Sequence, residues 1–173
     1  PTATLEATGD QNGDGLADMS FRRADGGWVF AYGQGEAAPV VAELGVLDGA
    51  WAIEAMPDLD GDGMGDLLLL NDNGFMAAMP SRAGGAALLT FGAGVAGPAD
   101  PGGGFVGLAA GWSLLGAADL SGDGKADLLL RTDAGQALLL LMDGTTATAA
   151  GLLPFTLLDT TLQMIRNIPA LAL

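Results

Sequence analysis

The chain contains no cysteine and no histidine. The absence of cysteine excludes disulfide bonds and thiol chemistry, and the absence of histidine removes the commonest general base and the commonest transition-metal ligand. No apolar run reaches the roughly 18 residues that a transmembrane helix needs, so we expect no insertion into a membrane. Oxygen-bearing side chains are therefore the main source of chemistry in this sequence.

Basic residues are also scarce. Lysine and arginine number 6 against 21 acidic residues, which gives a net charge of −15 at pH 7. A nucleic-acid-binding protein needs a basic surface, so this balance argues against nucleic acid as a partner, and equally against anionic membranes. Half of the 173 residues are hydrophobic, so the chain can bury a core and differs from a disordered acidic tail.

Ten of the acidic residues lie in one nine-residue pattern, D-x-[D/N/S]-G-D-G-x-x-D, which occurs three times. The copies begin at Asp10, Asp58 and Asp119, and we name them loop 1, loop 2 and loop 3. Oxygen-bearing side chains recur at positions 1, 3, 5 and 9 of each loop, and glycines occupy positions 4 and 6. A single copy would be read as an acidic surface turn, but three copies with the same oxygen spacing predict a metal loop.

Calcium is the metal that this spacing favours. It takes roughly six to eight oxygen ligands, and a short loop can supply them only if alternate side chains point inward and the backbone bends sharply. Glycine permits that bend because it adopts positive φ without a Cβ clash. The backbone carbonyl at position 7 is the expected main-chain ligand. We expect about three Ca²⁺ per chain, which would change the net charge from −15 to −9.

An EF-hand does not fit these loops. It needs a bidentate glutamate at position 12 and a following helix, whereas position 12 here is Phe21, Leu69 or Leu130. The segments after the loops are short apolar runs that end in turn residues, which is typical of strands. A dockerin-type pair would also need helices after its loops, at a shorter repeat.

The loops divide the chain into units of four short strands, with the loop between the first strand and the second. Turn signals rich in glycine, asparagine and aspartate separate the other strands. The predicted strands are 2–8, 16–23, 28–32 and 37–44; then 51–56, 67–70, 75–79 and 86–91; then 112–117, 128–131, 136–142 and 145–153. Trp51 and Trp112 precede the first aspartates of loops 2 and 3 by the same distance, and Ala3 holds that place before loop 1.

We therefore expect an all-β fold made of three four-stranded propeller-type blades, which is too few to close a ring alone. The whole chain, 1–173, forms a single repeat domain in this interpretation. The first blade covers about 1–46, the second about 47–91 and the third about 111–155. Residues 92–110, rich in glycine, proline and alanine, are predicted to be an inserted surface loop. Residues 162–171 are expected to form a trailing strand, because they can be laid over 50–59.

Two of the predicted strands are apolar at successive positions: 67–70 and 138–141. A strand with this pattern has both faces buried, and blades packed face to face around an axis provide that environment. The segment 19–22 instead alternates apolar and polar residues, which predicts a wetter face on the first blade. The last complete blade has no later blade to cover it, so its apolar face predicts an interface.

The segment 112–153, with its Gly-Ala-Ala-Asp-Leu-Ser-Gly-Asp-Gly-Lys-Ala-Asp core, resembles an FG-GAP/VCBS-type repeat. Such calcium-loop blades occur in integrin α-subunit propellers and in many bacterial surface proteins. The resemblance covers nearly the whole chain except for 92–110 and the tail. It implies calcium ligands at Asp10, Asn12, Asp14, Leu16, Asp18, Asp58, Asp60, Asp62, Met64, Asp66, Asp119, Ser121, Asp123, Lys125 and Asp127. Ser121 departs from the usual Asp or Asn, so the third site is predicted to be the weakest.

We expect no enzyme activity, because the scattered glutamates and the serines without a histidine partner form no catalytic constellation. The leading hypothesis is an extracellular calcium-binding structural or adhesive module that self-associates head-to-tail into an oligomer or filament. One alternative is a carbohydrate-binding, lectin-like propeller in which Trp28 and Tyr32 stack on a sugar. Another is a non-catalytic fragment or appendage of a larger secreted protein.

The expected localisation is extracellular or at the cell surface. The sequence shows no signal peptide and begins with Pro1 rather than methionine, so we expect a processed product or a fragment of a longer chain.

Overall fold

The computed structural model describes residues 2–46, 49–81, 89–90, 108 and 110–157. Twelve β-strands form in these ranges, and they are joined by turns and bends without any helix among the described residues. Accordingly, no helix in the described ranges has the length and apolarity that a membrane span requires. The all-β class predicted from the sequence is confirmed.

The strands form three sheets, each a meander in which every strand pairs antiparallel with its sequence neighbour. Sheet 1 contains β1 (Ala3–Gly9), β2 (Asp18–Arg23), β3 (Gly27–Tyr32) and β4 (Val40–Val46). Sheet 2 contains β5 (Trp51–Ala55), β6 (Leu67–Asn71), β7 (Met76–Met79) and β8 (Leu89–Thr90). Sheet 3 contains β9 (Trp112–Ala118), β10 (Asp127–Thr132), β11 (Gln136–Asp143) and β12 (Thr146–Thr156).

Each of the twelve strands predicted for the three blades has a counterpart in the structure. β4 covers Val40–Val46 rather than 37–44, and β12 ends at Thr156 rather than at residue 153. β2 begins at Asp18 rather than at residue 16, because Leu16 and Ala17 still belong to loop 1. Within the predicted insertion 92–110, the described Leu108 is buried, and its amide donates to the Gly74 carbonyl at 2.7 Å, so this residue packs on sheet 2. The rest of 92–107 and the predicted strand 162–171 lie outside the described residues.

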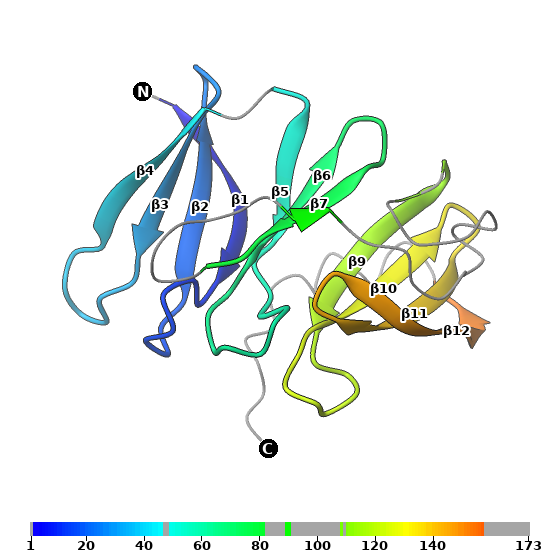
Figure 1. The fold of residues 1–173 in the computed structure, drawn as a ribbon. Helices are drawn as coiled ribbons and strands as arrows, with labels where there is room; N and C mark the ends of the chain where they lie inside the picture. The colour runs from blue at the N-terminus through cyan, green and yellow to red at the C-terminus, as the bar shows by residue number, and fades with distance from the viewer. Residues whose placement is uncertain (1, 47–48, 82–88, 91–107, 109, 158–173) are drawn as a thin grey trace.

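The sheets follow one another face to face, with their first strands innermost (Figure 1). β1 contacts β5, and β5 contacts β9. Each junction encloses an apolar cluster. The junction of sheets 1 and 2 contains Trp28, Phe30, Ile53 and other buried side chains. The junction of sheets 2 and 3 contains Leu59, Leu68, Met76, Leu114, Leu128, Leu130, Leu138, Leu140 and further members.

Sheet 2 is covered on both faces. Successive residues of a strand point to opposite faces, and both Leu68 and Leu69 in β6 are almost fully buried, at 0% and 1% exposure. Leu68 belongs to the cluster facing sheet 3, and Leu69 belongs to the cluster facing sheet 1. The prediction that this strand has two buried faces is confirmed.

Sheet 3 differs, although β10 and β11 carry the same kind of sequence. Leu130 and Leu138 face sheet 2 and are fully buried. Leu129 and Leu139, which pair with each other on the opposite face, are only partly buried. For 138–141, burial is complete only on the face toward sheet 2. The accompanying prediction that no later blade covers the other apolar face agrees with the described residues, among which no further sheet lies opposite Leu139.

We expect Leu130→Ala to lower the free energy of unfolding by about 2–5 kcal/mol, the usual cost of truncating a fully buried leucine. Leu129→Ala, one residue earlier in β10, should cost at least about 1 kcal/mol less, since solvent already reaches that side chain. Urea unfolding followed by circular dichroism in dilute solution measures both values. Equal losses would show that the two faces of sheet 3 are equally covered.

Candidate metal centre

The three acidic loops lie at the same end of the three sheets, where each connects the first strand of its sheet to the second (Figure 1). The glycines at positions 4 and 6 make this path possible. Their φ angles lie between 74° and 89° in all three loops, a region that residues with a Cβ rarely adopt. The sharp bend predicted from the glycine spacing is therefore confirmed in each copy.

The aspartate at position 1 organises the turn of its own loop. In loop 2, one oxygen of Asp58 accepts hydrogen bonds from the amides of Gly61 and Asp62 at 2.7 and 3.2 Å, and the other accepts from Gly63 at 2.8 Å. Asp10 and Asp119 make the equivalent three bonds in loops 1 and 3. Backbone hydrogen bonds from Gly124 and Gly122 lower the pKa of the Asp119 carboxyl.

The aspartate at position 9 is the buried member of each loop. Asp18, Asp66 and Asp127 have no exposed surface. In loop 3, one oxygen of Asp127 accepts from the amides of Leu120 and Ser121 at 2.9 and 2.8 Å. Asp18 and Asp66 hold the start of their loops in the same way. Each buried carboxylate thus closes its loop against the beginning of the second strand.

The second oxygen of the same aspartates reaches the end of the third strand. It accepts a backbone amide hydrogen from the residue fifteen places further on: Gly33 at 2.9 Å, Ser81 at 2.8 Å and Met142 at 2.9 Å. The donors share no side-chain type because the backbone makes the bond. Sequence analysis missed this connection for that reason, and only the recurring fifteen-residue separation could have revealed it.

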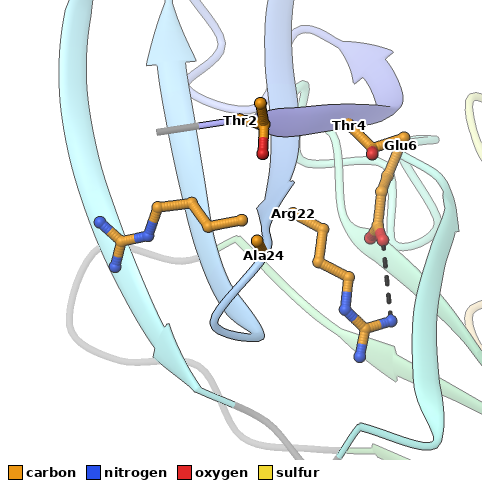
Figure 2. Close-up of a pocket in the computed structure, with 6 residues that line it drawn as sticks. Thr2, Thr4, Glu6, Arg22 and Ala24 are labelled. Carbon is orange, nitrogen blue, oxygen red and sulfur yellow. Dashed lines mark ion pairs between the residues drawn. The ribbon is translucent and has the colours of Figure 1, made fainter.

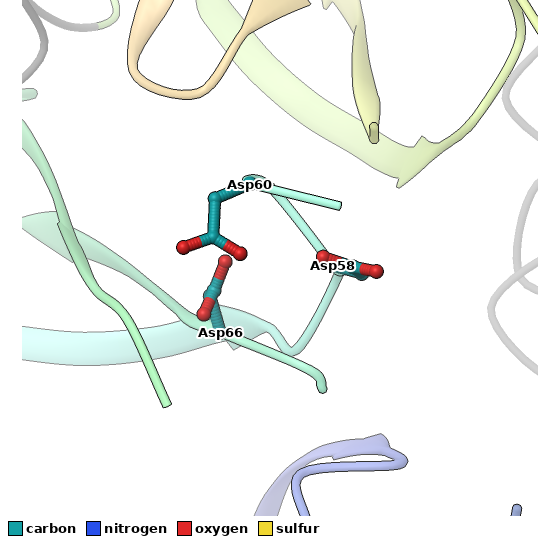
Figure 3. Close-up of side chains that lie close together, drawn as sticks. All are labelled: Asp58, Asp60 and Asp66. Atoms are coloured by element: carbon teal, nitrogen blue, oxygen red, sulfur yellow. The ribbon is translucent and has the colours of Figure 1, made fainter. Parts of the chain in front are cut away.

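Loop 2 has the densest arrangement of carboxylates. Oxygens of Asp58, Asp60 and Asp66 all lie within 4.8 Å of one another, and Figure 3 shows the carboxylates of Asp60 and Asp66 directed toward each other. Burial raises the pKa of the Asp66 carboxyl, and the negative charges of Asp60 and Asp62 raise it further, against the lowering effect of hydrogen bonds from Ser81 and Leu59. A cation at this point would relieve that repulsion.

The remaining predicted side-chain ligands are arranged locally. The position 5 carboxylates of Asp14, Asp62 and Asp123 each accept from the amide of the residue at position 7, at 2.8–2.9 Å. At position 3 of loop 1, the Asn12 side chain donates to Asp14 at 3.0 Å. Among the described residues, loop 2 is the place where three acidic side chains meet this closely, since position 3 is Asn12 in loop 1 and Ser121 in loop 3.

A shallow pocket lies beside β1 and β2, and one of its lining residues, Arg22, connects sheet 1 to the next unit. Its lining includes Glu6 and Arg22, whose charged groups form an ion pair at 3.8 Å (Figure 2). Arg22 also donates to the carbonyls of Trp51 and Gly49 in the next unit, at 2.7 and 2.9 Å. The Arg22 guanidinium lies 5.9 Å from the centre of the Trp28 ring, which is 1% exposed. Trp28 is thus a core residue and cannot stack on a sugar.

We expect Asp127→Ala to lower the free energy of unfolding by about 1–3 kcal/mol in the presence of a chelator, because three backbone amides lose their acceptor. Chelator is included so that metal binding does not contribute. The control is Asp72→Ala, an exposed aspartate in a turn of sheet 2, which should change stability by no more than about 0.5 kcal/mol. If the two variants unfold at the same denaturant concentration, the buried carboxylate does not stabilise the fold.

We compared the chain with protein families, curated proteins and solved structures. No protein-family model, no curated protein and no solved structure matches the chain. The interpretation of the loops therefore rests on the chain's own threefold repetition.

Proposed function

We propose that the protein is a calcium-binding structural module in which the three loops each bind one Ca²⁺. The observation that carries this proposal is the convergence of Asp58, Asp60 and Asp66 in loop 2, on a backbone path that loops 1 and 3 repeat. Carboxylate and carbonyl oxygens are the ligands that calcium prefers. The proposed ligand set is the one predicted from the sequence, with the position 7 carbonyls of Leu16, Met64 and Lys125 included.

The hydrogen bonds in the loops leave acceptor capacity for a cation. An ionised carboxylate offers about four lone-pair sites. Asp58 uses three of these for backbone amides, and Asp66 uses two, one on each oxygen. The amides thus hold the carboxylates in position, and the remaining lone pairs are available to a cation.

Electrostatics gives the proposed calcium a structural role. The chain carries a net charge of −15, and ten of its acids lie in the three neighbouring loops. Like charges a few ångströms apart repel strongly where solvent screening is weak. Calcium bound at each loop would replace this repulsion by attraction, and binding to the folded chain alone would stabilise it by mass action.

The sheets support a propeller-type interpretation of the repeats, in keeping with the resemblance to FG-GAP/VCBS blades. Three four-stranded meanders pack face to face with their first strands innermost and their loops at one end. We propose that the module is extracellular, where calcium is abundant, and that its role is assembly or adhesion rather than catalysis. Trp28 gives no support to the carbohydrate-binding alternative, because sheet 2 covers it.

Calcium titration should show about three sites per chain and a melting temperature that rises with calcium concentration. Each site contributes about 2.7 kcal/mol when free calcium is 100 times its Kd. Isothermal titration calorimetry gives the stoichiometry, and a thermal melt with and without chelator gives the stabilisation. Magnesium at the same concentration is the control, because its octahedral preference fits such a loop less well. A melting temperature indifferent to chelator would overturn the proposal.

We expect Asp62→Ala to remove one calcium from the measured stoichiometry, because it deletes a charged ligand at the centre of loop 2. Ser121→Ala should leave three sites, with the third weakened by less than about tenfold, since water can replace a neutral hydroxyl ligand at a cost below about 1.4 kcal/mol. Calorimetry on both variants tests this ranking. The ranking is wrong if the two variants lose the same amount of calcium.

A further inference from the structure

The two junctions inside the chain are built from the same contacts. The amide of Gly65, at position 8 of loop 2, donates to the carbonyl of Asp10, at position 1 of loop 1, at 2.5 Å. The amide of Ala126, at position 8 of loop 3, donates in the same way to the carbonyl of Asp58 at 2.7 Å. Each loop therefore docks on the preceding loop in one fixed register.

A second contact repeats in the same register. The side chain at position 7 of each following loop lies against the glycine at position 4 of the preceding loop. A Cβ placed on Gly13 would be 2.9 Å from the Met64 side chain, and one placed on Gly61 would be 3.4 Å from the Lys125 side chain. The ammonium group of Lys125 continues past this point to pair with Asp143.

The sheet faces repeat as well. The same position of the first strand is occupied by Leu5 in sheet 1, Ile53 in sheet 2 and Leu114 in sheet 3. Ile53 and Leu114 face the preceding sheet and are 3% and 7% exposed, whereas Leu5 has no preceding sheet among the described residues and is 51% exposed. Phe21 and Val29, which share this face of sheet 1 with Leu5, are only partly buried.

The unit of loop 3 and sheet 3, at the opposite end of the stack from sheet 1, likewise has an exposed leucine at a position that is buried in the second unit. Position 2 of the loop is Leu59 in loop 2 and Leu120 in loop 3. Leu59 lies in the junction with sheet 3 and is 2% exposed, whereas Leu120 is 54% exposed. Leu120 and Leu129 occupy the positions that Leu59 and Leu68 hold in the second unit, where both belong to one apolar cluster. We therefore define the outer face of sheet 3 by Leu120, Leu129 and Leu139, of which the last two pair with each other.

The outer face of sheet 1, defined by Leu5, Phe21 and Val29, is thus apolar at its centre. The ion pair of Arg23 with Glu43, at 2.7 Å, borders it, because Glu43 pairs with Val29 and Arg23 lies on the Phe21 face of β2. The sequence predicted a wetter face for this sheet, and the structure places that face elsewhere. Ser20 is fully buried toward sheet 2, where its hydroxyl accepts from the Ala7 amide at 3.0 Å, and Arg22 makes its bonds across the same junction. The alternation in β2 therefore directs Ser20 and Arg22 into the junction and Phe21 outward, with Arg23 at the border of the outer face.

We propose that the outer face of sheet 3 in one copy binds the outer face of sheet 1 in a second copy, in the register of the two internal junctions. This deepens the self-association hypothesis: it assigns the two faces and the residues that meet. Ala17, an exposed residue at position 8 of loop 1, would donate its amide hydrogen to the Asp119 carbonyl of the neighbouring copy, as Gly65 and Ala126 do inside the chain. Leu16, which is 39% exposed, packs on Gly122, which has open space around it. Leu5 enters an apolar cluster with Leu120, Leu129 and Leu139.

Continuity with the internal junctions identifies a second copy as the occupant. Among the described residues, sheet 1 with loop 1 carries one half of each contact that repeats inside the chain, and sheet 3 with loop 3 carries the other half. The two halves belong to different faces. A symmetric pairing of two sheet 3 faces would instead leave Asp119 and Gly122 without the position 8 and position 7 partners that Asp58 and Gly61 have inside the chain. A heterologous contact of this kind leaves both ends of every assembly free to add another copy, and it closes only if the rotation per copy permits a ring.

The test uses the full chain in millimolar calcium, with sedimentation velocity over a concentration series. The unmodified chain should associate, and Leu5→Arg and Leu120→Arg should each raise the Kd for association at least about tenfold, because each inserts an unpaired charge into an apolar contact. Val40→Arg is the matched control, since Val40 in β4 is also 54% exposed but lies at the edge of sheet 1. It should associate like the unmodified chain. Circular dichroism and calcium stoichiometry verify that each variant is folded.

Mixing the two blocked variants gives the decisive result. Leu5→Arg retains its sheet 3 face and Leu120→Arg retains its sheet 1 face, so an equimolar mixture should form dimers and nothing larger. A Leu5→Arg variant that still dimerises alone would indicate a symmetric contact and overturn the proposal. A monomeric unmodified chain would also overturn it. If that monomer still binds three Ca²⁺, the calcium proposal stands and only the association proposal fails. If the chain associates as proposed but binds no calcium, the association proposal stands and the calcium proposal fails.

Discussion

The structure depends on one buried carboxylate in each repeat. Asp18, Asp66 and Asp127 each accept backbone amides from the start of their own loop and from the end of the third strand of their sheet. An ionised group without exposed surface is costly unless hydrogen bonds satisfy it. Here the backbone supplies those bonds, and in doing so it fixes the loop relative to the sheet. The carboxylates at positions 1, 3 and 5 are held on a rigid frame as a result.

That frame explains why a loop of glycines and acids can keep one shape. Glycine alone would make the loop flexible, since it loses the most conformational freedom on folding. The position 1 aspartate removes this freedom by accepting three consecutive amides, and the position 9 aspartate anchors both ends. The loop is then pre-organised, and in the proposed function a cation gains ligands without having to order them.

The same loops also determine how the sheets stack. The bond from Ala126 to Asp58 joins the backbone of one loop directly to that of its neighbour, and the apolar cluster between sheets 2 and 3 lies behind it. Hydrophobic burial supplies most of the driving force for such packing, but it is not directional. The loop contacts supply the direction, because the backbone hydrogen bond and the packing of position 7 on the preceding glycine recur with the same offset at both junctions. Successive sheets therefore stack with the same loop contact at each junction. The proposed association would repeat that contact between copies.

The sequence by itself determined the local structure of this protein. Glycine and asparagine turns, short apolar runs and the nine-residue oxygen pattern predicted the strands, their order and the three loops, because these features depend on neighbouring residues and on backbone sterics. Only the tertiary structure decided which faces are covered. β6 and β10 both contain consecutive leucines, yet Leu69 in β6 is buried whereas Leu129 in β10 is partly exposed. Burial depends on whether another sheet lies opposite, and no local pattern encodes that. The partners of the position 9 aspartates were also hidden, since Gly33, Ser81 and Met142 contribute backbone amides that any residue but proline could provide.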